Sequence, residues 1–261
     1  MKKLDPIKSL GQNFLLDQNI AKKIVDLLEP YDKRLVIEIG PGSGSLTKLL
    51  IEKADNFIAI EIDKRSVELL NKEFPNLRLI NEDFLKINLS ALVEDFNETI
   101  RIVGNIPYNI TSPILFKLFE YNKIIDDAVL MVQYEVAKRI AAKEKSKDFS
   151  ILSVASSFFF DVKFCFEVSP NVFYPKPKVY SAVIKLTKKE SKPNVDPSLF
   201  ISIVKACFNK RRKTLKNSLK SSIFKDLINL NLSVDLNKRA EELSFQDFVQ
   251  LAIAAQTYLK F

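Results

Sequence analysis

The first two thirds of the chain alternate short apolar runs with stretches of helical periodicity, and this alternation constrains the fold more than any other feature. Leu35–Ile39 is an apolar run that leads directly into a glycine-rich turn, Gly40–Gly44. Leucines at helical spacing follow the turn. Because strands separated by helices form parallel sheets that are covered on both faces, the sequence predicts a Rossmann-like α/β fold.

The same alternation predicts the number and direction of the strands. We expect seven, at residues 35–39, 57–60, 77–80, 100–103, 128–132, 162–168 and 180–186. The last two follow one another without a helix, because prolines interrupt the connection between them. We therefore expect a mostly parallel sheet with an antiparallel last pair.

A domain boundary is predicted after Lys188, where the sequence becomes polar, contains a proline and loses its periodicity. Three segments beyond this point have helical apolar spacing and no strand pattern, namely Phe200–Phe208, Lys213–Phe224 and Phe245–Leu259. We expect a cofactor-binding domain at 1–188 and a small all-helical domain at 189–261.

The 261-residue chain contains no histidine, which excludes the enzyme classes that use an imidazole as a base or a metal ligand. Cys165 and Cys207 form neither a metal-ligand spacing nor a disulfide framework, which is typical of a reducing compartment. Asp5 and Pro6 interrupt the region that an export signal needs to be apolar, and Ile151–Phe160 is too short to span a bilayer. We expect a cytoplasmic protein with no metal site and no membrane association.

Unusual residues follow four of the predicted strands: Gly40–Gly44, Glu61, Asp83 and Asn105. The carboxyl ends of parallel strands meet at one edge of the sheet, where open α/β sheets bind their ligands. Glycines let the backbone approach a ligand closely, and a carboxylate about 20 residues later commonly binds ribose hydroxyls. Glu61 stands at this spacing from Gly40. Each carboxylate taken singly could be a solvated strand-end charge, but together they predict a nucleoside cofactor.

The spacing of the glycines favours one such cofactor. The loop reads Glu-x-Gly-x-Gly-x-Gly from Glu38, whereas dinucleotide folds prefer Gly-x-Gly-x-x-Gly and a phosphate-binding loop supplies a lysine. S-adenosylmethionine has no phosphate, and its sulfonium cation tolerates nearby carboxylates. All five glycines lie in this region, in the predicted entry loop Leu10–Leu15, or at Gly104. We therefore predict S-adenosylmethionine as the cofactor.

The fourth strand ends in Gly104 and the box Asn-Ile-Pro-Tyr. A strand-to-loop turn with a packed tyrosine explains this box as well as a site does. As a site, Asn105 and a backbone carbonyl near Ile106 or Pro107 would accept the two hydrogens of an exocyclic aromatic amine, while Tyr108 stacks on its ring. These acceptors favour the pyramidal amine whose lone pair faces the methyl group. Positioning then supplies the catalysis without a strong base, and a base in a looped region is reached at less cost than one in a duplex.

Basic residues gather in Lys205–Lys220, which holds seven of them and no acidic residue in a chain of net charge +8. A charge run is ordinarily a solvated helix face, but a face this one-sided repels itself unless a polyanion binds it. We predict contacts to RNA phosphates from Lys210, Arg211, Arg212, Lys213 and Lys216.

Five segments, taken in order, resemble the small-subunit (16S-type) ribosomal RNA adenine N6,N6-dimethyltransferase family. They are Gln12–Leu15, Glu38–Gly44, Asn105–Pro113, Phe173–Val179 and Asn209–Leu215. The glycine loop alone is a general methyltransferase signal, and the Asn-Ile-Pro-Tyr box occurs in other adenine methylases. The ordered set runs nearly end to end and is specific.

The resemblance implies a class I methyltransferase sheet. It also implies methyl transfer from S-adenosylmethionine to the N6 amines of two adjacent adenines, in a loop near the 3′ end of small-subunit ribosomal RNA, during ribosome biogenesis. The implied cofactor contacts are Asn13, Leu15, Gly40, Gly42, Glu61, Asp83 and Asn105. The implied catalytic contacts are Asn105, Pro107, Tyr108 and Phe173. Phe173 would be a second aromatic face for the adenine, with a core phenylalanine as the alternative. The expected partner is small-subunit RNA or the immature small subunit, and we expect a monomer.

The sequence departs from the family pattern at Tyr134, where lysine is common, at Ser150, where glycine is usual, and at Tyr180, where aspartate is typical. These departures concern the RNA contact and loop geometry rather than the predicted chemistry.

Two other functions stay open. A large-subunit (23S) RNA adenine methylase of the resistance type is disfavoured by Asn209–Leu215, and a non-catalytic nucleic-acid-binding assembly or transcription factor is disfavoured by the intact glycine loop and Asn105.

Overall fold

The computed structural model describes residues 4–29, 31, 33–93, 99–210 and 212–258. By its internal contacts the chain forms two compact units. The first consists of Met1–Ala137 and Asp161–Lys188, and the second of Lys138–Phe160 and Lys189–Phe261. One crossing between the units thus falls after Lys188, where the sequence predicts a boundary. The segment 138–160, which the sequence prediction places in the first domain, makes its contacts within the second unit.

The first unit is built on a seven-stranded sheet of order β4-β3-β2-β5-β6-β9-β7. The strands are β2 (Leu35–Ile39), β3 (Phe57–Glu61), β4 (Arg78–Asn81), β5 (Ile100–Asn105), β6 (Ile125–Gln133), β7 (Phe160–Val168) and β9 (Ser181–Lys188). Strands β4, β3, β2, β5 and β6 are parallel, and β9 runs antiparallel to β6. The predicted class I methyltransferase sheet, mostly parallel with an antiparallel last pair, is confirmed. Its strand order is a further finding, since β9 lies between β6 and β7.

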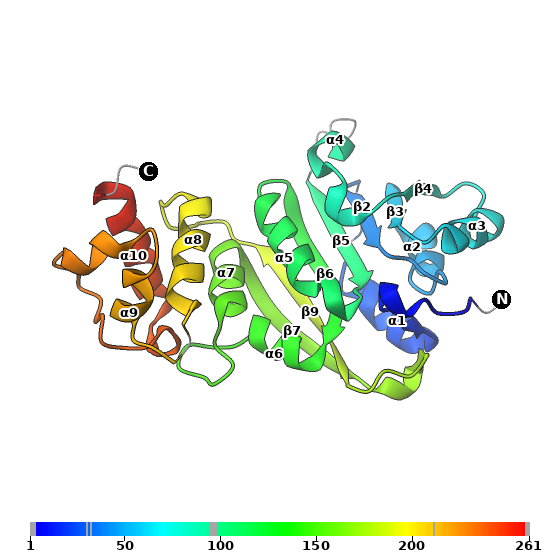
Figure 1. Ribbon diagram of the computed structural model, residues 1–261. Helices are drawn as coiled ribbons and strands as arrows, with labels where there is room; N and C mark the ends of the chain where they lie inside the picture. The colour runs from blue at the N-terminus through cyan, green and yellow to red at the C-terminus, as the bar shows by residue number, and fades with distance from the viewer. Residues whose placement is uncertain (1–3, 30, 32, 94–98, 211, 259–261) are drawn as a thin grey trace. The chain divides into compact units, whose positions relative to one another are not determined.

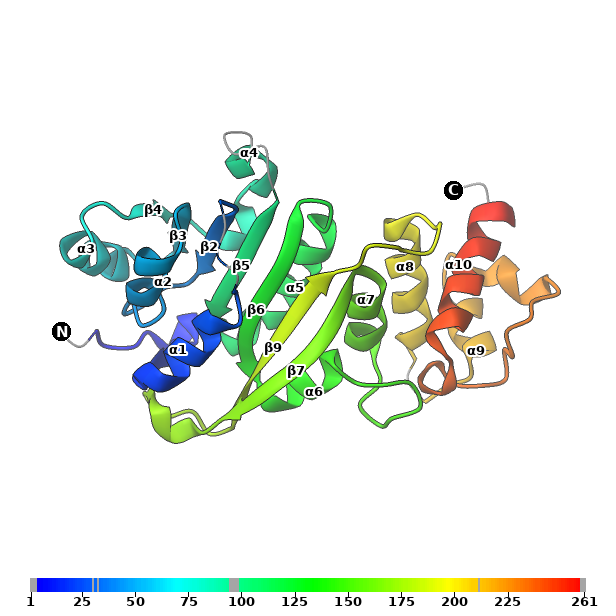
Figure 2. The ribbon, with the colours of Figure 1, turned by 180° about the vertical axis from the view of Figure 1, so that it is seen from behind.

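Helices cover both faces of this sheet, as the alternation predicts. The helices of the first unit are α1 (Gln18–Asp26), α2 (Thr47–Lys53), α3 (Lys64–Glu73), α4 (Leu89–Val93) and α5 (Thr111–Glu120), while α6 (Tyr134–Ile140) begins in the first unit and ends in the second. In Figure 1 α5 lies in front of the sheet, and in the opposite view of Figure 2 α1 does. The sequence pattern also predicts a short helix around residues 91–96; α4 covers its beginning, and residues 94–98 lie outside the described part of the chain.

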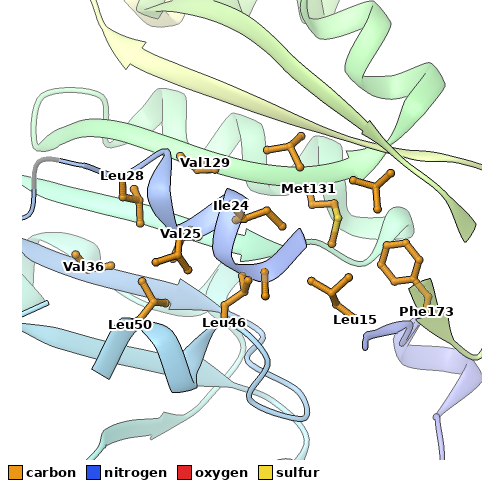
Figure 3. Close-up of a cluster of buried hydrophobic side chains, with 14 residues drawn as sticks. Leu15, Ile24, Val25, Leu28, Val36, Leu46, Leu50, Val129, Met131 and Phe173 are labelled. Atoms are coloured by element: carbon orange, nitrogen blue, oxygen red, sulfur yellow. The ribbon is translucent and has the colours of Figure 1, made fainter. Parts of the chain in front are cut away.

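The core on the α1 face shows why this part of the sequence folds as it does. Asp17 begins α1 by accepting backbone N–H groups of Asn19 and Ile20 with its side chain, at 2.8 and 3.1 Å. Apolar residues then recur at helical spacing and face the sheet and α2. Figure 3 shows the resulting cluster, which includes Ile24, Val25, Leu28, Val36, Leu46, Leu50, Val129 and Met131. Burial of these side chains holds α1 in place on the sheet.

A buried ion pair lies near the amino-terminal ends of β5 and β6. Arg101 of β5 donates to both oxygens of Asp127 of β6, at 2.8 and 2.5 Å, and both side chains are almost fully buried. Lys185 of β9 approaches the same carboxylate at 3.3 Å. Removing one partner of such a pair leaves an uncompensated buried charge, which typically costs about 3–5 kcal/mol. The ion pair links β5 to β6, and Lys185 links β9 to the same carboxylate.

The second unit is helical. Its helices are α7 (Ile151–Phe159), α8 (Pro197–Phe208), α9 (Leu215–Lys220) and α10 (Phe245–Tyr258), and Figure 2 shows α8, α9 and α10 gathered together. Stacked phenylalanines join α7 to α8 and α8 to α10: the ring centroids of Phe158 and Phe200 lie 4.1 Å apart, and those of Phe208 and Phe248 lie 5.7 Å apart. Ser150, at the position of a family glycine, begins α7 with a capping box.

The helix predicted over Lys213–Phe224 is shorter than the periodicity indicates. After α9 ends at Lys220, the hydroxyl of Ser222 donates to the carbonyl of Leu219 and accepts from the backbone N–H of Phe224 at 3.1 Å. Local serine bonds of this kind compete with helical backbone bonds, which explains the early end.

Across the described residues, no helix combines the length and the apolarity that crossing a membrane requires.

Candidate active site

A cavity of about 190 Å³ lies in the first unit at the carboxyl ends of the parallel strands. The parallel register places these ends together, because Ile39 of β2 pairs with Ile60 of β3 and with Gly104 of β5. The residues that follow each strand therefore meet. Nine of the residues predicted for the site line the cavity: Asn13, Leu15, Gly40, Gly42, Glu61, Asp83, Asn105, Pro107 and Tyr108.

The glycine loop after β2 needs its glycines for backbone geometry and for space. Gly40 and Gly42 have left-handed φ angles of +63° and +55°, which side-chain-bearing residues rarely adopt. A Cβ atom on Gly42 would also lie 3.1 Å from the ring of Phe14, whereas one on Gly40 would meet no atom within 4 Å. The loop is thus held close to Phe14 and stays open at Gly40, where a ligand can approach the backbone.

Glu61 is held at the end of β3 by two backbone N–H groups. Its Oε2 accepts from Gly42 at 2.9 Å and its Oε1 accepts from Asp63 at 2.8 Å. The side chain is buried, and this burial raises the pKa of its carboxyl although both hydrogen bonds act in the opposite direction. Each oxygen keeps a second lone pair, so the carboxylate is oriented and can still accept a hydroxyl hydrogen.

Asp83 lies two residues after the end of β4 and begins a short 3-10 turn, Phe84–Lys86. Its Oδ1 accepts the backbone N–H of Leu85 at 2.9 Å. The same turn carries Phe84 and Leu85 into the cavity lining. Sequence reasoning did not assign these two residues to the site, although their position directly after a predicted site carboxylate was a usable signal.

Asn105 ends β5 with its amide oriented by a neighbouring backbone. Its Nδ2 donates to the carbonyl oxygen of Asn13 at 2.8 Å. The amide nitrogen is therefore engaged with the amino-terminal segment, and the acceptor atom Oδ1 is the end available to a ligand. The acceptor role of Oδ1 stays a prediction, and the bond to Asn13 fixes the direction of the amide that the role requires.

The residues after Asn105 are fixed at both backbone and side chain. Ile106 donates its N–H to the carbonyl of Met131 at 2.9 Å, and the carbonyl of Pro107 accepts the N–H of Ile110 at 3.1 Å. The Tyr108 hydroxyl lies 2.7 Å from Ser181 Oγ on β9, and partial burial raises the pKa of this phenol. The tyrosine ring is thereby anchored at its far end beside the cavity.

Phe173 is not among the residues that line the cavity, although it pairs with one of them. It belongs to β8 (Phe173–Tyr174), which pairs antiparallel with β1 (Phe14–Leu15), and it pairs with Leu15. Its ring is buried in the cluster of Figure 3. In the described structure Phe173 thus packs as a core residue, and its predicted contact with adenine stays a prediction.

Carboxylic side chains dominate the charged lining of the cavity. Glu38, Glu61, Glu82 and Asp83 line it, and among its described lining residues there is no lysine or arginine. Glu38 is buried at the end of β2 and accepts from the hydroxyl of Thr47 at 2.7 Å. Across the described chain, no group of three histidine, cysteine or acidic residues is placed to hold a metal ion. Such a lining suits a cationic ligand and opposes a phosphate-bearing one.

The residues predicted for RNA phosphates belong to the second unit. Lys210 follows α8, Arg212 and Lys213 precede α9, and Lys216 lies on α9; all four side chains are exposed. Arg211 lies outside the described residues. The exposed basic residues Lys205 and Lys220 extend the same stretch.

Comparison with known proteins finds similar sequences over nearly the whole chain. A family model described as "Ribosomal RNA adenine dimethylase" matches residues 6–257. A protein of Parabacteroides distasonis named "Ribosomal RNA small subunit methyltransferase A" is 44% identical, with 100% of this chain and 97% of the relative covered. A protein of the same name from Flavobacterium johnsoniae is 46% identical, with 96% of each chain covered.

Two solved structures are similar in fold and sequence. A dimethyladenosine transferase from Plasmodium falciparum has a TM-score of 0.79 and 26% identity, covering 94% of this chain and 98% of that one. The 23S rRNA methyltransferase ErmE has a TM-score of 0.69 and 27% identity, covering 92% and 98%. The chain therefore resembles a dimethyladenosine transferase and a 23S rRNA methyltransferase in fold, while its identity to the relatives named as small-subunit methyltransferases is higher.

The buried Glu38 predicts a pH-dependent stability. Burial raises the pKa of its carboxyl from 4.5 to about 8. Unfolded chains ionise this group above pH 4.5, whereas folded chains keep it protonated until about pH 8. The stability that the neutral carboxyl contributes is thus complete below the lower value and is lost as pH rises through the upper one. Glu38→Gln keeps an acceptor for Thr47 and removes the titration. The unfolding free energy of this variant relative to that of the wild type should therefore increase as the pH rises from 4.5 to about 8.

Urea unfolding at several pH values between the two limits measures this difference. Glu52→Gln, an exposed carboxylate of α2, is the matched control and should show no such trend. A constant difference between Glu38→Gln and the wild type would contradict the assignment of a raised pKa.

Proposed function

Because the chain belongs to the ribosomal RNA adenine dimethylase family, we propose that it is an S-adenosylmethionine-dependent dimethyltransferase of small-subunit ribosomal RNA. In this proposal it methylates the N6 amines of two adjacent adenines in a loop near the 3′ end, giving N6,N6-dimethyladenine during ribosome biogenesis. The single observation that carries the proposed chemistry is Asn105, whose amide nitrogen is bound to Asn13 so that Oδ1 is left as an acceptor at the cavity.

The cavity fits the proposed cofactor by its charge and its backbone. The described lining contains acidic side chains and no lysine or arginine, so no basic residue in it repels a sulfonium cation. Glu61 would accept the ribose hydroxyls, because two backbone N–H groups orient its oxygens. Gly40, with open space where a Cβ would be, would lie against the cofactor, and Asp83, Asn13 and Leu15 would complete its contacts. When bound, this cofactor supplies an electrophilic methyl group.

The protein's part in the reaction is to shape and place the adenine amine. Asn105 Oδ1 would accept one N6 hydrogen. The second would go to the backbone carbonyl of Ile106 or of Pro107, the latter of which also accepts the N–H of Ile110. With both hydrogens held, the nitrogen lone pair turns towards the methyl group, and Tyr108 holds the ring by stacking. On accepting the methyl group the N6 nitrogen would become cationic and acidic, so water would suffice to take its proton and no residue of this chain would need to act as a strong base.

The second unit would bind the RNA backbone. Exposed basic side chains from Lys205 to Lys220 lie in a stretch without an acidic residue, and phosphate contacts of this kind supply much of the affinity for nucleic acid. We assign these contacts to Lys210, Arg211, Arg212, Lys213 and Lys216. The proposed partner is small-subunit RNA or the immature subunit, bound by one copy of the chain in the cytoplasm.

Asn105→Ala tests the proposed chemistry. It removes the acceptor Oδ1, so we expect methyl transfer to small-subunit RNA to fall by at least about a hundredfold, the usual effect of losing one well-placed polar group in a transition state. Affinity for S-adenosylhomocysteine should fall much less, because most cofactor contacts remain. Radioactive methyl incorporation and calorimetry measure the two quantities.

Asn71→Ala, on the exposed face of α3, is the matched control and should behave as the wild type. Full methyl transfer by Asn105→Ala would refute the proposed acceptor.

Charge reversal tests the RNA contact. The double variant Arg212→Glu with Lys213→Glu should bind RNA more weakly and reduce the slope of log affinity against log salt concentration by about 2, since about one counterion is released per phosphate contact. Filter binding over a range of salt concentrations measures this slope.

Lys48→Glu with Lys72→Glu changes the net charge equally on exposed positions of α2 and α3 and serves as the control. An unchanged slope in the Arg212 and Lys213 variant would show that these residues do not contact phosphate.

A further inference from the structure

The amino-terminal segment, residues 4–16, depends on other parts of the first unit for its position over the cavity. It contributes Ser9–Leu15 to the cavity lining. Its own regular structure is only a short 3-10 turn, Lys8–Leu10, and the two residues of β1. Of its residues, only Phe14 and Leu15 are buried. Such a segment has few backbone bonds of its own, so its conformation is set by the contacts it makes with its surroundings.

One end of the segment is anchored by backbone pairing. Phe14 and Leu15 pair with β8, and Leu16 donates its N–H to the carbonyl of Val172 at 2.8 Å. The hydroxyl of Ser45, beyond the glycine loop, donates to the carbonyl of Leu15. These contacts fix residues 14–16 but not the preceding part of the segment, residues 4–12.

The preceding part is held by a side-chain network centred on Asp63. Gln12 donates from Nε2 to Asp63 Oδ2 at 2.8 Å and accepts the backbone N–H of Ile7 at 2.9 Å. Arg65 donates to the same Asp63 oxygen at 2.7 Å and to the carbonyl of Asp5 at 3.0 Å. The network therefore clamps the segment at three positions, Asp5, Ile7 and Gln12.

The same aspartate is bonded to the predicted cofactor carboxylate. The backbone N–H of Asp63 donates to Glu61 Oε1 at 2.8 Å. On the other side, Gln12 is followed by Asn13, whose carbonyl oxygen binds the amide nitrogen of Asn105 at 2.8 Å. A continuous path of bonds thus leads from Glu61 through Asp63 and Gln12 to Asn105. It joins the two halves of the site that the proposed reaction needs.

The bond between Gln12 and Asp63 has the properties of a strong one. The Asp63 side chain is buried, and hydrogen bonds from Arg65 hold the pKa of its carboxyl at about 2, so it is ionised at neutral pH. Hydrogen bonds to a charged acceptor are roughly twice as strong as neutral ones. Both ends of the Gln12 amide are engaged by protein atoms, so Gln12 acts on its neighbours rather than as a ligand.

We propose that Gln12 and Asp63 are positioning residues that couple cofactor binding at Glu61 to the orientation of Asn105. The inference rests on the proposed function for the roles of Glu61 and Asn105. Loss of the bond should release the preceding part of the segment. It should then weaken cofactor binding, and slow methyl transfer beyond that effect because Asn13 no longer fixes the Asn105 amide.

An exchange of donor and acceptor tests this coupling. Gln12→Glu places a carboxylate against that of Asp63. In Asp63→Asn the amide oxygen is needed at the Oδ1 position, where it accepts the backbone N–H of Arg65, so the NH2 group faces that of Gln12. Each single variant therefore loses the bond. In the double variant, the new amide at position 63 can donate to the new carboxylate at position 12, and Ile7 still has its acceptor. Asparagine is also a good helix N-cap, so α3 keeps its start.

We expect each single variant to raise the dissociation constant of S-adenosylhomocysteine about tenfold, a typical effect of losing one hydrogen bond to a charged group. The kcat for methyl transfer should fall as well, and the double variant should recover both quantities to within about threefold of the wild type. Gln18→Glu and Glu68→Gln make the same kind of chemical change at positions outside the network and should have no effect.

Unchanged affinity in both single variants, or a double variant no better than the singles, would overturn the coupling. Raised KM with an unaltered kcat would overturn the part that reaches Asn105. Thermal melting of each variant separates these results from a general loss of folding. Should a single variant unfold, Gln12→Met removes both bonds without adding charge, and the same affinity change is expected of it.

Calorimetry with S-adenosylhomocysteine needs no RNA. If the wild type binds it but methylates no small-subunit RNA, the proposed function fails while the affinity results still decide the coupling.

Discussion

The parallel register of β2, β3 and β5 is the constraint on which the site depends. Ile39 pairs with Ile60 on one side and with Gly104 on the other. Three strands from distant parts of the sequence therefore end at one level, and the glycine loop, Glu61 and Asn105 meet there. A shift of any one strand by a residue would turn its side chains to the other face and dissolve the site. The buried pair of Arg101 and Asp127, at the far end of β5, helps to hold this register.

Burial at that edge also determines the electrostatics of the cavity. Glu38 and Glu61 are removed from water, so the pKa of each is raised, while Asp63 stays ionised because Arg65 binds it. A cationic cofactor would meet no lysine or arginine in the described lining, so no basic side chain there would repel it. The basic stretch of the second unit has the opposite chemistry and suits a polyanion. One chain thus carries two separate charged surfaces, one for each proposed substrate.

Much of this could be predicted from the sequence because the decisive patterns are local. The apolar runs and helical spacing predict the strands and helices of the sheet, and residues at strand ends predict the cavity lining from Gly40 to Tyr108. What escaped prediction depends on contacts between distant segments. Gln12 and Asp63 are 51 residues apart, and no local pattern indicates that they bond. The position of β9 between β6 and β7 and the contacts of residues 138–160 within the helical unit are likewise decided by tertiary packing. The burial of Phe173 in the core, which the sequence leaves as one of two alternatives, depends on the same packing.

The most direct test of the account is methyl transfer to purified small subunits, large subunits and naked ribosomal RNA, with the modified base mapped in each product. The account predicts incorporation into small-subunit RNA, confined to the N6 amines of two adjacent adenines near its 3′ end and reaching two methyl groups on each. Labelling confined to large-subunit RNA, or the absence of any transfer by a folded enzyme that binds S-adenosylmethionine, would contradict it.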